Sequence, residues 1–257
     1  MINSYVCLDL ETTGLDPKRD KIIEIGAIKI KDGEIIGKFE TFVNPQRLLE
    51  ERIVELTGIR DEQLKDAPEI TDILPELLDF IGEDILLGHS VLFDYAFVKK
   101  AAINQRLKFE KFGIDTLKIA RKFLPDLESR SLGFLCTHFE IEHNAHRALT
   151  DAKATSQLYH KLAELFYDGH ENDFKPTLLS YNAKRDTPVT IPQKEQLYKL
   201  LDRHKIIIDY RAKNTVFHKT NSIRQQDSGT STSVDIEKLT RSEASRIIAQ
   251  ILAEYGR

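Results

Sequence analysis

The sequence predicts an α/β fold, in which helices flank a mixed five-stranded β-sheet and a small, mostly helical module follows. Three observations lead to this fold class. The chain opens with an apolar strand and two alternating segments, which make a three-strand meander. Short apolar segments then alternate with helical periodicity, which adds two parallel strands. Near residue 168 the composition changes, and a polar stretch with three prolines shows no sustained period.

The first three strands can be read from residue patterns. Residues 6–10 are apolar except for Asp9, which favours a buried strand. Residues 21–45 alternate between apolar and polar side chains on both sides of Lys31-Asp32-Gly33. A polar pair ending in glycine between two alternating segments is a hairpin signal, so these residues predict two antiparallel strands.

Helical spacing of apolar residues and short apolar runs predict the elements that follow. The predicted order is helices over 47–59, about 60–66 and 70–81, a strand over 85–90, a helix over 91–105, an edge strand over 108–112, and helices over 115–123, 131–139 and 148–166. The predicted domain therefore covers residues 1–167.

Residues 168–192 are predicted to be a linker, because they are polar and aperiodic. The module at 193–257 is predicted to hold a helix over 193–205, a short strand over 206–210, a flexible loop over 220–235 and a final helix. The final helix begins with the capping box Thr240-x-x-Glu243 and ends before Gly256.

Composition limits the class of protein. The chain has 257 residues, of which 41% are hydrophobic and 30% are charged, as in soluble globular proteins. It has no apolar run of about 18 residues and no basic, apolar leader at its N-terminus, so we expect neither a membrane partner nor a signal peptide. Cys7 and Cys136 lie in apolar surroundings, which favours a reducing, cytoplasmic location.

Charge is divided unevenly along the chain. Residues 1–170 carry 22 Lys and Arg against 30 Asp and Glu, whereas residues 171–257 carry 15 against 11. The acidic first part is poorly suited to broad electrostatic binding of nucleic acid but suits a site for divalent cations. The basic second part favours a module with a separate role.

Two carboxylates interrupt the first strand. Asp9 and Glu11 are two residues apart, so their side chains project from one face of the strand. Buried, unpaired charges are costly, and each carboxylate disfavours ionisation of the other. A cation is therefore expected between them. Three more ionisable residues lie near the predicted beginnings of later helices. They are Asp94 in GHSVLFD, and His146 and Asp151 in HRALTDA.

Together these motifs resemble a known family. DLETTG, the His-x4-Asp spacing at 89–94 and the same spacing at 146–151 are similar to the DEDDh, DnaQ-like 3′–5′ exonucleases. This family has a ribonuclease H-like fold and includes the proofreading epsilon subunit of DNA polymerase III. The exonuclease domain of the Gram-positive replicative DNA polymerase is the nearest likeness, and the resemblance covers about residues 3–166.

The resemblance implies a site for two divalent cations, Mg²⁺ or Mn²⁺, which prefer oxygen ligands. In this site Asp9 bridges both ions, Glu11 and Asp151 complete the ligand set, and Asp94 acts mainly through water. His146 is the expected general base, since an unperturbed histidine with a pKa near 6.5 accepts a proton at neutral pH.

The resemblance also implies how a nucleotide is held. Phe93 corresponds to an aromatic residue near the penultimate base, and His89 begins the second motif. Many relatives have His-Asn where this chain has His89-Ser90, so a contact made by that asparagine is not expected here. The pocket for the terminal nucleotide corresponds to Thr12, Thr13, Gly14 and Leu15.

These observations lead to a predicted activity and to alternatives. The expected substrate is the 3′ end of single-stranded DNA, hydrolysed to nucleoside monophosphates in proofreading, repair or end trimming. An exoribonuclease that trims RNA or short oligoribonucleotides is the alternative, because the metal chemistry attacks the same phosphodiester. A catalytically silent binding module is a third reading, which the presence of all five site residues disfavours. The C-terminal module is open to three roles: helical packing, a grip on nucleic acid, or recruitment of a polymerase or repair partner.

Overall fold

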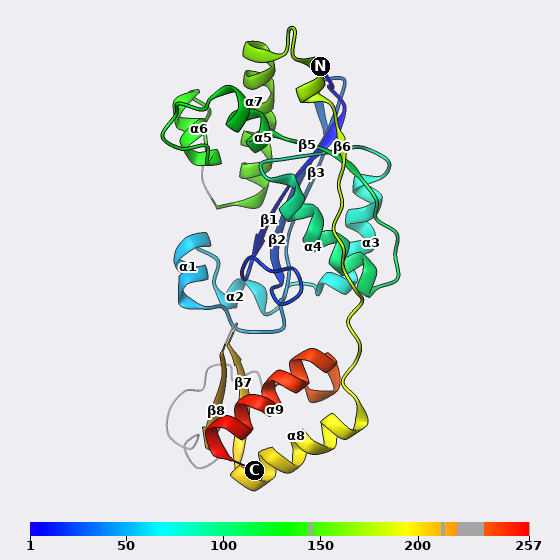
Figure 1. Cartoon of the computed structure of the whole chain (residues 1–257), viewed down its shortest axis with the longest axis vertical. Helices are drawn as coiled ribbons and strands as arrows, with labels where there is room; N and C mark the ends of the chain where they lie inside the picture. Colours follow the sequence, from blue (N-terminus) through cyan, green and yellow to red (C-terminus); the bar gives the residue numbers. More distant parts are fainter. Residues whose placement is uncertain (144–145, 212–213, 220–233, 257) are drawn as a thin grey trace. The chain divides into compact units, whose positions relative to one another are not determined.

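The computed structural model describes residues 1–143, 146–211, 214–219 and 234–256 (Figure 1). It contains two compact units. The first comprises Met1–Gln46 and Arg52–Ala183, and the second comprises Arg47–Glu51 and Lys184–Arg257.

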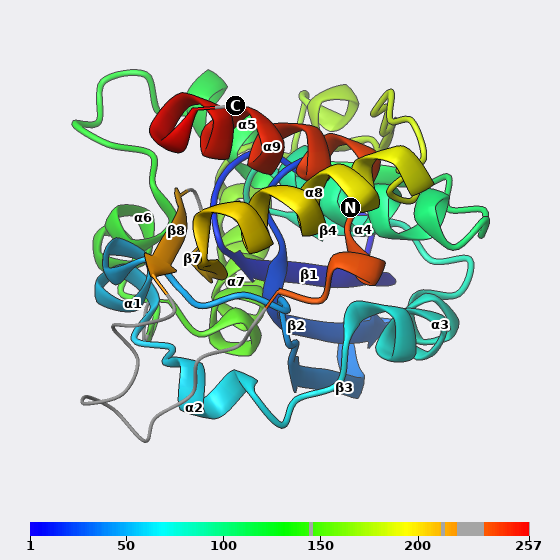
Figure 2. The ribbon, with the colours of Figure 1, turned by 90° about the horizontal axis from the view of Figure 1, so that it is seen from below.

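The first unit is built on a six-stranded sheet with the order β3-β2-β1-β4-β5-β6. Antiparallel pairing joins β1 to β2 and β2 to β3, whereas β1, β4 and β5 are parallel. Figure 2 shows β1, β2 and β3 side by side. The predicted mixed sheet is confirmed, but it has six strands rather than the predicted five. The strands are β1 (Tyr5–Thr12), β2 (Ile22–Lys31), β3 (Glu34–Phe42), β4 (Leu86–Gly88), β5 (Phe112–Asp115) and β6 (Thr177–Leu178).

The hairpin between β2 and β3 turns at Asp32 and Gly33, as predicted. Their φ angles are 51° and 87°. Two consecutive positive φ values define the tight turn that matches strand twist, and glycine adopts such a value at little steric cost.

Two parts of the prediction differ from the structure. The edge strand predicted at 108–112 is β5 at Phe112–Asp115, because Gly113 and Ile114 are the buried residues that pair with β4. Part of the predicted linker at 168–192 belongs to the first unit, and β6 within it pairs antiparallel with β5. Phe174 and Leu179, on either side of β6, are buried in the core of that unit, which explains why the chain stays on the sheet.

Helices cover both faces of the sheet (Figure 1). Val6, Leu8 and Leu10 of β1 share a hydrophobic core with residues of α3 and α4. Tyr5 and Cys7 point to the other face and share a second core with residues of α5, α6 and α7. The helices and the short 3-10 helix of this unit are α1 (Glu51–Thr57), α2 (Asp61–Leu64), α3 (Ile70–Ile81), α4 (Val91–Asn104), α5 (Thr116–Phe123), α6 (Leu132–His138), α7 (Ala148–Phe166) and η1 (Glu171–Phe174).

The second unit contains α8 (Ile191–His204), β7 (Ile206–Arg211), β8 (Asn214–Lys219), η3 (Ile236–Lys238) and α9 (Arg241–Tyr255). Its core is formed mainly by aliphatic side chains of α8 and α9. The predicted capping box is present, since Thr240 Oγ1 accepts a bond from Glu243 N and Glu243 Oε2 accepts one from Thr240 N.

Predictions for this unit meet different outcomes. The helix and strand predicted at 193–205 and 206–210 are confirmed as α8 and β7. The structure adds β8, which pairs antiparallel with β7. Most of the predicted loop at 220–235 lies outside the described residues. Among the described residues, no helix combines the length and the apolar character needed to cross a membrane.

Candidate active site

Three carboxylates meet where β1 passes under the beginning of α7. Side chains alternate along a strand, so Asp9 and Glu11 share the face of Tyr5 and Cys7, which α7 covers. Asp151 lies in the first turn of α7. Ligand oxygens of Asp9, Glu11 and Asp151 all lie within 4.8 Å of one another. Converging carboxylates of this kind suit a divalent cation with oxygen ligands.

Asp94 reaches the same strand from the helical layer on its other face. It lies in the first turn of α4 and is buried, and its Oδ1 accepts a hydrogen bond from Leu10 N at 3.0 Å. Asp94 is not part of the cluster whose oxygens lie within 4.8 Å of one another. That placement is compatible with the predicted contact to metal through water.

The electrostatics of these four carboxylates favour a cation. Burial is the largest cause of a raised pKa at each of them, and neighbouring carboxylates add to it at Asp9, Glu11 and Asp94. The pKa values of Asp9 and Asp94 are raised well above their usual range, and that of Glu11 is raised to about 7. The pKa of Asp151 is also raised by burial, although a hydrogen bond from His143 opposes the shift. A divalent cation would reverse these shifts, so the residues present fit a metal site.

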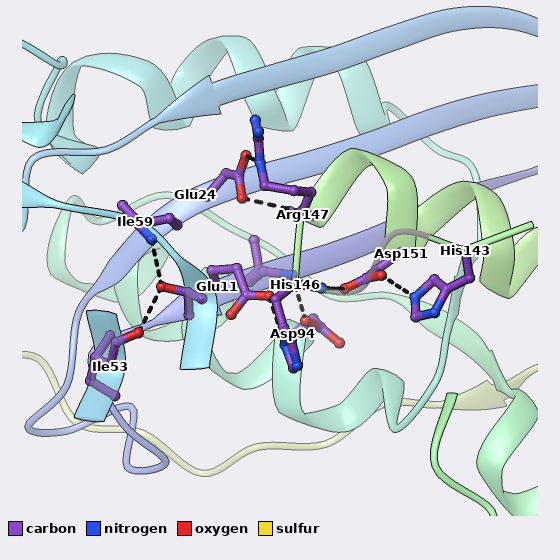
Figure 3. Close-up of polar contacts among 12 residues, drawn as sticks. Glu11, Glu24, Ile53, Ile59, Asp94, His143, His146, Arg147 and Asp151 are labelled. Atoms are coloured by element: carbon purple, nitrogen blue, oxygen red, sulfur yellow. Dashed lines mark hydrogen bonds and ion pairs between the residues drawn. The ribbon is translucent and has the colours of Figure 1, made fainter. Parts of the chain in front are cut away.

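His146 stands beside these carboxylates (Figure 3). Its Nδ1 lies 3.9 Å from Oε1 of Glu11, and its side chain is 47% exposed. The backbone N of His146 donates to Asp151 Oδ2 at 3.1 Å, and its φ is 65°, in the left-handed region. A half-exposed imidazole at this position can exchange protons with solvent while facing the acidic cluster.

Sequence reasoning missed His143. Its Nε2 lies 2.5 Å from Oδ1 of Asp151, and its side chain is almost entirely buried (Figure 3). Asp151 is thus held through both oxygens, by His143 and by the backbone of His146. A signal was available: His143 precedes His146 by three residues, in a segment that leads directly into α7.

The residues predicted to hold the terminal nucleotide lie at the end of β1 and in the loop that follows it. Thr12 Oγ1 donates to Gly14 O at 2.7 Å, and Thr13 Oγ1 accepts a bond from Lys21 N at 3.0 Å. A Cβ on Gly14 would lie 2.5–2.8 Å from the Asp20 carboxylate, so a larger residue there would displace the Asp20 side chain. Leu15 is 83% exposed, which leaves its side chain available for contact. Their role in substrate binding stays a prediction.

The two remaining predicted residues have different environments. Phe93 is partly buried, and its ring centroid lies 5.0 Å from that of Phe97. His89 uses both ring nitrogens: Nδ1 lies 2.9 Å from Thr116 Oγ1, and Nε2 lies 2.8 Å from Arg130 O. Burial lowers the pKa of His89, so the neutral ring donates from Nε2 to the carbonyl of Arg130. These contacts tie the end of β4 to the first residue of α5 and to the segment before α6. A contact of His89 with substrate stays a prediction.

Comparisons with known proteins identify an exonuclease domain in this chain. A protein-family model described as "Exonuclease" matches residues 6–159. The chain is 38% identical over 224 residues to a DNA polymerase III of the PolC type from Oceanobacillus iheyensis. That alignment covers 81% of this chain but only 16% of the polymerase. The chain thus spans a small part of the length of the PolC-type relative.

A shorter relative is matched over most of its length. The DNA polymerase III epsilon subunit of Aquifex aeolicus is 39% identical over 163 residues, which covers 63% of this chain and 81% of the subunit. Among solved structures, Escherichia coli exonuclease I in complex with a dT13 oligonucleotide is similar with a TM-score of 0.59 and 19% identity. This match covers 66% of this chain and 43% of that chain, and it concerns the fold alone.

Proposed function

The chain belongs to the exonuclease family, and from this premise we propose that it releases nucleoside monophosphates from the 3′ ends of single-stranded DNA. It is a 3′–5′ exonuclease, and hence a phosphodiester hydrolase. The observation that carries the proposal is the convergence of Asp9, Glu11 and Asp151 on one cation-sized cluster beside His146.

Exonucleases of this family use divalent metal ions, and the acidic cluster fits that requirement. We propose two ions, Mg²⁺ or Mn²⁺, held by Asp9, Glu11 and Asp151, with Asp94 acting mainly through water. When bound, such a pair activates water and stabilises the charge that develops on the attacking and leaving oxygens. The raised pKa values of the carboxylates mean that protons and metal compete for the same oxygens.

His146 is the proposed general base. Its neutral imidazole accepts a proton from the attacking water as the new oxygen–phosphorus bond forms. The bond from phosphorus to the 3′ oxygen of the shortened strand breaks, and that oxygen takes up a proton to become the new 3′ hydroxyl. The imidazolium that results lies near Oε1 of Glu11, whose negative charge stabilises it.

DNA is favoured as substrate because the PolC-type and epsilon relatives are, by name, parts of a DNA polymerase. The chemistry at phosphorus is the same for RNA, so exoribonuclease activity is the second candidate. We also propose that residues 184–257 serve strand binding or a polymerase or repair partner, and that the protein acts in the cytoplasm.

A paired digestion tests the substrate. Single-stranded DNA and RNA of one sequence, both labelled at the 5′ end, are incubated with protein and Mg²⁺, Mn²⁺ or EDTA. We expect DNA to shorten from its 3′ end with release of nucleoside 5′-monophosphates, and no reaction in EDTA or with Asp9→Ala. Faster digestion of RNA would establish the exoribonuclease alternative. Inactivity on every strand with both metals would favour the silent binding module.

A further inference from the structure

A buried carboxylate outside the predicted site holds the beginning of α7. Glu24 on β2 is 1% exposed and lies opposite Glu11 in the antiparallel register of β1 and β2. Its Oε1 accepts a hydrogen bond from Arg147 Nε at 3.0 Å, and its Oε2 accepts one from Ala148 N at 3.2 Å (Figure 3). A buried charge persists only where it is paired and hydrogen-bonded, and both oxygens of Glu24 meet this condition.

The backbone of α7 lies directly on the same strand. A Cβ on Gly26 would lie 2.0–2.5 Å from backbone atoms of Ala148 and Leu149. Glu24 and Gly26 are two residues apart, so both face α7. The glycine permits the close approach, and the glutamate supplies the polar contact that fixes it. The first turn of α7 is therefore tightly located against β2.

This contact directly follows the residue proposed as the base. His146 directly precedes Arg147, and its φ of 65° lies in the left-handed region. Residues other than glycine adopt this backbone conformation at an energetic cost. A conformation of this kind persists where the surrounding structure fixes it. The two residues that follow His146, Arg147 and Ala148, both donate hydrogen bonds to Glu24. Asp151 lies three residues after Ala148 in α7.

We propose that Glu24 and Arg147 are positioning residues, which hold the backbone of His146 so that its imidazole faces the acidic cluster. The inference rests on the proposed role of His146 and extends it to residues that do not touch the reacting atoms. Misplacement of a catalytic group by about 1 Å can cost about 10²-fold in rate, so a loosened contact at Glu24 should have a large effect on turnover.

The chain supplies a matched control. Arg147 has a second carboxylate neighbour on β3, where Glu40 Oε1 lies 3.6 Å from Arg147 Nη2. The guanidinium of Arg147 also lies over the ring of Phe42. The Glu40 side chain is 47% exposed, and the backbone N of Ala148 donates to Glu24 instead. Glu40→Gln therefore alters the outer contact of the same arginine but leaves the inner one intact.

The test compares Glu24→Gln with Glu40→Gln in the 257-residue chain on labelled single-stranded DNA. Glutamine keeps the shape of Glu24 but offers an amide NH₂ to one of the two donors, so one hydrogen bond and the ion pair are lost. We expect Glu24→Gln to lower kcat by about 10²-fold, with KM for DNA and Mn²⁺ affinity from calorimetry within about twofold of wild type. Glu40→Gln should retain wild-type kcat.

A double variant separates positioning from general destabilisation. If Glu24 acts through His146, then Glu24→Gln should cause little further loss of turnover in the His146→Ala background. A full additional loss there, or wild-type kcat in Glu24→Gln, would overturn the proposal while leaving the exonuclease activity unaffected. Wild-type turnover in His146→Ala would instead refute the base and, with it, the positioning role. If Glu24→Gln does not fold, Arg147→Gln decides by the same criteria, since the Arg147 side chain is half-exposed.

Discussion

Raising the pH from about 5 to about 8 in EDTA should destabilise the first unit, because ionisation brings negative charges together in a buried cluster. The pKa of Glu11 is raised from 4.5 to about 7 by burial, by Asp151 and by Glu24. A carboxyl group whose pKa is raised by folding contributes stability that is complete below the unfolded value. This contribution is lost as the pH rises through the folded value. The relevant window for Glu11 is therefore pH 4.5 to 7.

The size of the effect follows from the shift. Each pKa unit corresponds to 1.36 kcal/mol, so Glu11 alone accounts for about 3 kcal/mol across this window. Its side chain is only 12% exposed, so solvent screening removes little of this. For a folding unit of this size about 3 kcal/mol lowers Tm by roughly 6–12 °C. The raised pKa values of Asp9, Asp94 and Asp151 act in the same direction.

The assay is thermal unfolding by calorimetry in EDTA across this pH range, for wild type and for Glu11→Gln. Glutamine is nearly isosteric and does not titrate, so the variant should lose less stability with rising pH and should exceed wild type near pH 8. Glu34→Gln, at an exposed position on β3, is the control and should follow the wild-type profile. Parallel profiles for wild type and Glu11→Gln would refute the idea that Glu11 is held at an elevated pKa.

Three further predictions concern metal, base and domain boundary. Asp9→Ala should abolish turnover and remove the rise of Tm with millimolar Mn²⁺; retention of a tenth of wild-type turnover would disprove the two-metal assignment. His146→Ala should lower turnover by about 10²–10⁴-fold while Mn²⁺ affinity from calorimetry stays close to wild type; equal loss of metal affinity would place His146 among the ligands instead. A chain ending at Ala183 should fold and keep single-turnover hydrolysis, because the five site residues and β6 lie in the first unit. A chain ending at His170 loses the buried Phe174, so its Tm should be well below that of the chain ending at Ala183. If residues 184–257 grip the strand, removing them should also flatten the plot of log affinity against log salt by about 0.7 per lost phosphate contact; an unchanged slope would leave packing or partner docking as their role.

Much of the site could be predicted because its geometry follows from local rules. The two-residue period of a strand places Asp9 and Glu11 on one face without knowledge of the rest of the fold. Asp94 and Asp151 belong to the first turns of helices that helical periodicity identifies well. The strand–helix alternation then limits where these helix starts can lie. These regularities bring the acidic residues to one region, and the resemblance of DLETTG and the two His-x4-Asp spacings to the DEDDh exonucleases singled them out as a site.

The supporting residues could not be predicted, because their roles depend on register and on distant partners. Glu24 reads as an ordinary polar position in an alternating strand, and its partner Arg147 is more than a hundred residues away. Similarly, β6 has only two residues, both exposed, so it gives no periodic signal. The apolar residues on either side of it, Phe174 and Leu179, are buried only because the sheet is complete.

Asp94 shows how the sheet itself creates the site. The parallel strand β4 is short and pairs with β1 at Val6 and Cys7 only, so β1 continues beyond its partner. An unpaired buried N–H group is costly, and Leu10 N lies in this extension of β1. The carboxylate of Asp94 accepts that hydrogen bond where no strand is present to do so. The end of strand pairing thus leaves room for a carboxylate from α4 at the edge of β1. The same contact that completes the backbone hydrogen bonding brings Asp94 to the proposed metal site.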